Sequence, residues 1–113
     1  MPKFISLFSL TSDTLARFIE HPEDRRGAVA RAAEAAGGRL EAYYWMFGPY
    51  DGLVIFEAPD AAAAAAAVLA TTSSGAFKHF ETHELIEAAD LVTILQQAQT
   101  LRPSYRPPGQ PGG

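Results

Sequence analysis

The chain has 113 residues, 48% hydrophobic and 19% charged, which is long enough for one packed domain and too short for two. Its net charge of -4, without a cluster of Lys or Arg, argues against binding to nucleic acid or anionic lipid. The absence of cysteine excludes disulfides and thiolate metal sites and fits a cytoplasmic protein. The longest apolar run, residues 61–70, is too short to span a membrane, so no membrane partner is expected.

The N-terminal third of the chain predicts one strand followed by two helical segments. Residues 4–10 are mostly apolar and predict the first strand, and Thr11 is a favoured N-cap type for a short helix over residues 14–20. Pro22 is poorly accommodated inside a helix, so a second helical segment is expected after it, ending at the glycine pair 37–38. Four residues of that segment form one apolar stripe with helical spacing: Val29, Ala32, Ala33 and Ala36.

The middle of the chain predicts a hairpin followed by a long helix. Residues 39–47 predict the second strand, residues 48–52 have the composition of a turn, and residues 53–57 predict the third strand. Asp60 is expected to cap an alanine-rich helix that runs to about Thr71.

The C-terminal part predicts a fourth strand over residues 76–86 and a last helix over residues 89–101. Residues 102–113 hold four prolines and three glycines, so we expect an extended or disordered tail after a single domain of residues 1–101. The order βαββαβ with one further helix predicts an α+β, ferredoxin-like fold with a four-stranded antiparallel sheet.

Both faces of the predicted sheet carry bulky apolar side chains. On the second strand, Tyr43, Trp45 and Phe47 are expected on one face and Tyr44 on the other. The two main helices cover one face only, and burying even four such side chains is worth about 6–12 kcal/mol. We therefore expect a homodimer, or a higher homo-oligomer, in which two sheets pack face to face. The alternative is that the last helix folds back across the open face.

The turn Gly48-Pro49-Tyr50-Asp51 matches the Gly-x-Tyr-Asp signature of the GYD domain family. Pro59-Asp60 after the third strand and Gly75 before the fourth also stand where that family has them. The chain resembles this family over about residues 3–88. The resemblance implies a dimeric α/β barrel, a group that includes monooxygenases, isomerases and stress proteins. It assigns no catalytic role to the signature residues.

The fourth strand carries His79-x-Glu81-x-His83, the strongest candidate for chemistry. Alternate residues of a strand share a face about 6.5–7 Å apart, so neighbouring members can converge on a divalent transition metal such as zinc or iron(II). His79 and His83 would lie about 13 Å apart on a straight strand, so a bulge or other ligands would be needed to unite all three. The alternative is a polar edge strand whose charges discourage aggregation.

Tyr50, Asp51 and His79 are the candidates for catalytic residues. A phenol beside a carboxylate at a hairpin tip can supply a hydrogen-bond donor and a general base. Asp51-Gly52 is also a common turn pair, which makes a structural role for Asp51 the alternative.

The aromatic run of the second strand suggests a pocket for a flat organic molecule. The candidates for ligand-binding residues are Tyr44, Trp45, Phe77 and His83. Three hypotheses for function follow: a binding protein or enzyme for a small organic molecule, a metal-binding protein or metalloenzyme, and an assembly module without chemistry.

Overall fold

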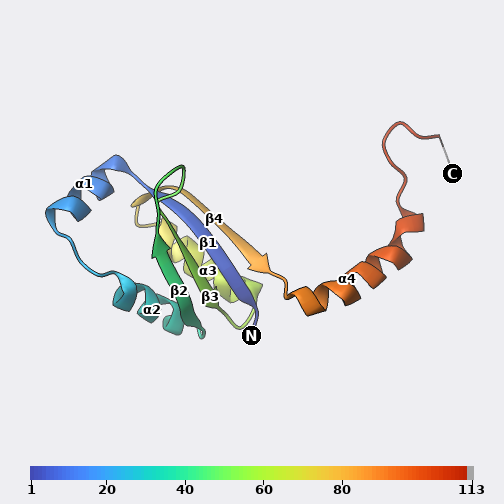
Figure 1. Ribbon diagram of the computed structural model, residues 1–113, viewed down its shortest axis with the longest axis horizontal. Coiled ribbons are helices and arrows are strands. Elements are labelled where there is room, and N and C mark those ends of the chain that lie inside the picture. The colour runs from blue at the N-terminus through green and yellow to red at the C-terminus, as the bar shows by residue number, and fades with distance from the viewer. Residues whose placement is uncertain (112–113) are drawn as a thin grey trace.

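The computed structural model describes residues 1–111 and shows one four-stranded antiparallel sheet with three helices beside it and a fourth helix at its end (Figure 1). The order of the strands across the sheet is β2-β3-β1-β4, and every neighbouring pair is antiparallel. This confirms the predicted ferredoxin-like fold. The elements are β1 (Lys3–Leu10), α1 (Ser12–Glu20), α2 (Arg26–Ala35), β2 (Arg39–Trp45), β3 (Gly52–Glu57), α3 (Ala61–Thr72), β4 (Phe77–Leu85), α4 (Ala88–Leu101) and a 3-10 turn (Arg102–Ser104).

The sheet has one face covered by α1, α2 and α3 and one open face. Directly paired residues of antiparallel strands point to the same face, so the register assigns each side chain to one of them. Phe8 of β1 pairs with Phe80 of β4, and Phe4 pairs with Phe56 of β3. Their rings stack at 5.9 and 5.5 Å and form the centre of the core on the helix-covered face.

Local signals set the ends of the helices. The Asp60 carboxylate accepts a hydrogen bond from the Ala63 amide at 2.8 Å, which confirms the predicted N-cap of α3. At the end of α2, Gly37 has a φ of +88° and the Gly38 amide donates to the Ala33 carbonyl at 3.0 Å. This is the left-handed closure that a glycine adopts without strain.

The second strand is shorter than predicted. β2 ends at Trp45, and Phe47 lies fully exposed in the following loop, so the expectation that it shares a face with Tyr43 and Trp45 is wrong. The reason is the loop geometry: Gly48 has a φ of +120°, and the chain returns to the sheet only where the Met46 amide donates to the Asp51 carbonyl at 2.8 Å.

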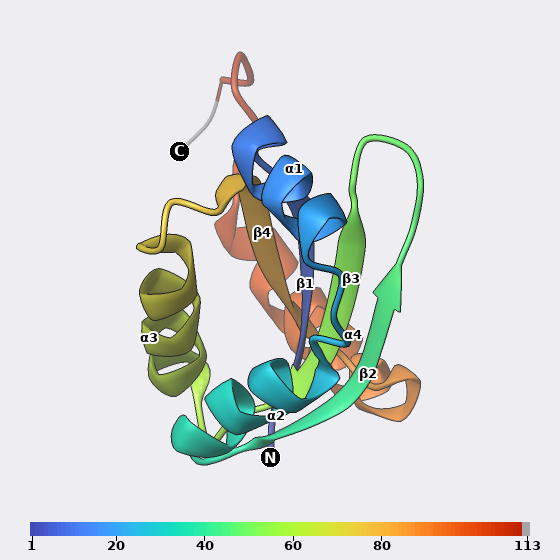
Figure 2. The same cartoon turned by 90° about the vertical axis from the view of Figure 1, so that its left-hand side faces the viewer.

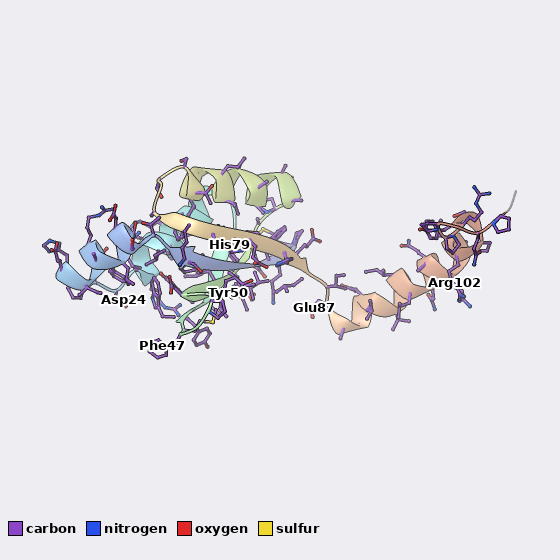
Figure 3. All side chains as sticks on the ribbon, turned by 90° about the horizontal axis from the view of Figure 1, so that it is seen from above. Asp24, Phe47, Tyr50, His79, Glu87 and Arg102 are labelled. Carbon is purple, nitrogen blue, oxygen red and sulfur yellow. The ribbon has the colours of Figure 1, made fainter. Side chains whose placement is uncertain are left out.

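Helix α4 extends away from the sheet instead of folding across it (Figures 1 and 3). The chain measures 63 × 32 × 23 Å with a radius of gyration of 18.6 Å, against about 13 Å for a compact domain of this length. The open face therefore has no cover within the described residues. Of the predicted tail, the structure describes residues 102–111, and residues 112–113 lie outside the described residues. None of the helices in residues 1–111 has the length and apolar character to cross a membrane.

Candidate functional site

A pocket of about 640 Å³ is lined by residues of the sheet and of α1, α2 and α3. Figure 2 shows these three helices on one side of the sheet. The pocket exists because α2 and α3 face the sheet with small side chains: Ala33 and Ala64 are the buried residues of these two helices. Alanine fills little of the space between a helix axis and a sheet. Seven aromatic side chains line the pocket: Phe8, Phe18, Tyr43, Trp45, Phe56, Phe77 and Phe80.

The aromatic side chains form a continuous wall. Trp45 packs edge-on against Phe8 at 5.5 Å and meets Phe18 of α1 at 5.3 Å, while Phe77 packs edge-on against Phe8 at 5.4 Å. Such rings present flat apolar surface to a ligand. Trp45 and Phe77, two of the residues predicted to bind a ligand, therefore meet in one site.

Tyr43 supplies a polar group in this wall. Burial raises the pKa of its phenol to about 12, so the hydroxyl keeps its proton at neutral pH. Within residues 1–111, that hydroxyl makes no side-chain hydrogen bond. It is therefore free to donate to a ligand or to water.

The exposed polar part of the pocket lining, which we call the mouth, comes from α1 and the α1–α2 connection. It consists of Arg17, His21, Glu23 and Arg25. Neither Phe18 nor Arg17 was among the residues predicted from the sequence. Their spacing with Thr14 and His21, at i, i+3, i+4 and i+7, was the available signal that they share one face of a helix.

A second group of polar side chains lies on the open face of the sheet (Figure 3). Glu81 is at its centre: Tyr50 donates from its hydroxyl to Glu81 Oε1 at 2.7 Å, His79 Nε2 lies 2.8 Å from the same oxygen, and His83 Nε2 lies 2.7 Å from Oε2. An ionised carboxylate only accepts hydrogen bonds, so both imidazoles carry a proton on Nε2. We call these four residues the Glu81 cluster.

Hydrogen bonding sets the charge state of the cluster. Bonds from His83, Tyr50 and His79 lower the pKa of Glu81 to about 2. The same contact raises the pKa of Tyr50, because its phenol proton is held by a carboxylate. Tyr50 therefore acts as a hydrogen-bond donor at neutral pH and not as a base.

The cluster is not arranged as a metal site. Among residues 1–111, no three His, Cys, Asp or Glu side chains are placed to hold a metal ion. The imidazoles point at two different oxygens of Glu81 instead of at a common centre. Tyr44 lies on the same face of the sheet but is 64% exposed, so the predicted ligand-binding residues are divided between the two faces.

The GYD domain family matches residues 4–95 of the chain. The chain belongs to the GYD family. A relative from Thermus thermophilus, named glutamine synthetase and cystathionine beta-lyase binding protein, is 38% identical over 96 residues, which are 85% of this chain and all of the relative. The predicted resemblance is thus confirmed.

Two solved structures share the fold of this GYD protein. TTHA0845 from Thermus thermophilus is 18% identical with a TM-score of 0.51, and the match covers 78% of this chain and 96% of that protein. At3g17210 from Arabidopsis thaliana is 14% identical with the same TM-score and the same coverage.

The residues of the GYD signature have distinct contacts in this chain. Gly48 provides the positive φ of the loop, and Tyr50 reaches Glu81 of β4. Asp51 Oδ2 accepts from the Leu10 amide at 2.8 Å, and the Asp51 amide donates to the Phe8 carbonyl at 2.8 Å. The partner of the Tyr50 phenol is therefore Glu81 and not the neighbouring Asp51, whose carboxylate ties the loop to the end of β1.

Proposed function

We propose that this GYD protein binds a small, largely apolar organic molecule in the pocket between the sheet and α1, α2 and α3. The observation that carries the proposal is the pocket itself, about 640 Å³ and walled by seven aromatic residues where a small domain normally has packed core. Pockets of this size and character are typical of small-molecule sites.

The energetics favour an occupied pocket. The pocket is open to solvent at the exposed residues of its lining, so it holds water when no ligand is bound. Water beside the aromatic wall finds few polar partners there. An organic molecule that replaces this water gains transfer free energy for the apolar surface that it buries.

The test uses Nile red, a neutral dye whose emission rises in apolar surroundings. Ala67 lines the pocket, whereas its neighbour Ala66 is exposed and does not. We expect Ala67→Phe to fill the pocket and abolish dye binding, and Ala66→Phe to bind like the original protein. Equal binding by both variants would place the dye elsewhere and refute the pocket as the site.

A second function, binding of a partner enzyme, is favoured by the name of the Thermus relative and by α4. This helix carries an apolar stripe that the described residues do not cover, with Leu91, Ile94, Leu95 and Leu101 all at least 40% exposed. We propose that α4 contacts glutamine synthetase or cystathionine beta-lyase, the enzymes in the name of the relative, by laying this stripe in an apolar groove.

The test of this second function measures binding to the two purified enzymes by biolayer interferometry. Leu95→Asp places a charge in the stripe, and Gln96→Asp places the same charge beside it. We expect the first variant to lose binding and the second to retain it. If neither enzyme binds the unmodified chain, or if both variants bind alike, this function is refuted.

We further propose that the chain forms a homodimer through the open face of the sheet. Ile5, Leu7, Leu53 and Ile55 lie on this face, and α4 leaves them without cover. Two such faces packed together would exclude water from these side chains, which is the main driving force for association. The Glu81 cluster would then lie between the two sheets.

A further inference from the structure

We propose that the pocket selects organic acids, molecules with an apolar body and one carboxylate, and that Arg17 holds the carboxylate. This inference rests on the proposed small-molecule function and names its ligand class. Three features of the described residues support it: the orientation of α1, the pairing of charges at the mouth, and the free hydroxyl of Tyr43.

Helix α1 turns Phe18 and three polar residues toward the pocket and leaves two aliphatic residues exposed. Its pocket-facing stripe is Thr14, Arg17, Phe18 and His21, while Leu15 and Ile19 are 43% and 69% exposed. A helix that only had to cover a sheet would turn its aliphatic residues inward. Arg17 is exposed to solvent and also lines the pocket, so its guanidinium supplies positive charge at the open side of the pocket.

The charges around the mouth leave Arg17 available. Glu23, the acidic residue of the lining, pairs with Arg25 at 3.0 Å. Asp13 and Glu20 stand four residues before and three residues after Arg17 on the same helix, yet within residues 1–111 Arg17 forms no ion pair. A guanidinium without a protein partner binds a carboxylate through two parallel hydrogen bonds.

The rest of the pocket fits the body of such an acid. Phe18 and Trp45 lie 5.3 Å apart, so the ring that follows Arg17 on α1 belongs to the aromatic wall. The Tyr43 hydroxyl offers a hydrogen-bond donor in the same lining. The ligand class is therefore an aryl or aliphatic monocarboxylate. Amines are disfavoured, because their positive charge would meet the unpaired guanidinium of Arg17.

The test compares three molecules with one body and different heads: 4-phenylbutyrate, 4-phenylbutanamide and 4-phenylbutylamine. Each is titrated against the protein loaded with Nile red. We expect the acid to displace the dye at least about tenfold more tightly than the amide, and the amine to bind most weakly. High salt should reduce the advantage of the acid, because the site is open to solvent.

Two variants test whether Arg17 is the residue that binds the carboxylate. Arg17→Gln should lower the affinity for the acid to that for the amide and leave the affinity for the amide unchanged. Arg31→Gln removes an exposed arginine of α2 that does not line the pocket, and it should leave the preference intact. Because both variants are read against the amide, a general loss of folding cannot imitate the expected result.

Three results would each overturn the assignment to Arg17. They are equal displacement of the dye by the acid and the amide, no displacement by any of the three molecules, and an acid preference that survives Arg17→Gln. In those cases Nile red still binds in the pocket and the proposed small-molecule function stands. If Nile red itself fails to bind, the small-molecule function and this inference fall together.

Discussion

Removal of the Asp51 carboxylate tests whether this signature residue supports the fold or carries out chemistry. In the structure, Asp51 Oδ2 accepts from the Leu10 amide at 2.8 Å, and Leu10 is a buried residue at the end of β1. Asp51 does not line the pocket. We therefore expect Asp51→Ala to lower stability while leaving ligand binding by the folded protein unchanged.

The magnitude follows from the contact that is lost. A hydrogen bond to a charged group is worth about 1.5–3 kcal/mol, and a buried amide left unpaired puts the loss in the upper part of that range. We expect a loss of about 2–3 kcal/mol for Asp51→Ala. Asp51→Asn keeps an acceptor oxygen in the same place and should cost less than about 1.5 kcal/mol.

Urea unfolding followed by the emission of Trp45 measures this loss, because Trp45 is the single tryptophan of the chain. With a slope of about 1–3 kcal/mol per molar urea, the midpoint for Asp51→Ala should fall by about 1 M. Nile red affinity is measured on the same samples. An Asp51→Ala variant with unchanged stability and lost binding or activity would refute the structural role and restore Asp51 as a functional residue.

Three further predictions follow from single contacts. The pKa of Glu81 in the folded chain, about 2, lies below its ordinary value of 4.5, so its stabilising contribution is complete above pH 4.5 and is lost as the pH falls toward 2. Glu81→Gln should flatten the dependence of stability on pH in that window, measured by urea unfolding at several pH values; an unchanged slope would contradict it. A Cβ on Gly38 would lie 1.7 Å from the Glu57 carbonyl oxygen, so Gly38→Ala should cost at least about 3 kcal/mol. Gly27→Ala is its control, because the Cβ there meets only the end of a flexible side chain, and equal thermal midpoints for the two variants would refute the steric argument. Ile55→Glu on the open face should convert a homodimer to monomers in native mass spectrometry, and a dimer that persists would exclude this face as the interface.

Much of the fold could be predicted from the sequence because its signals are local. The N-cap of α3 at Asp60 depends on residues three positions apart, and the end of α2 depends on a glycine pair. Tyr43 and Trp45 lie on one face of the sheet and Tyr44 on the other, because successive side chains of a strand point to opposite faces. The family resemblance also depended on short segments, namely residues 48–51, Pro59-Asp60 and Gly75.

The candidate site was predicted only in part. Trp45 and Phe77 were predicted from the sequence to bind a ligand, and both line the pocket. It did not identify Arg17, because a helical stripe of polar and aromatic residues has the same pattern whether it faces solvent or a cavity. It also paired Tyr50 with its neighbour Asp51, whereas the phenol bonds to Glu81, 31 residues further along the chain.

By itself, the sequence determined the order of the elements, the ends of most of them and the two apolar faces of the sheet, because each depends on residues within one turn or one strand. Only the tertiary structure decided where α1 turns Arg17, how much space the alanines of α2 and α3 leave, and that α4 extends away from the open face. These features depend on the register of strands and the packing of helices across long sequence separations. No local pattern encodes that information.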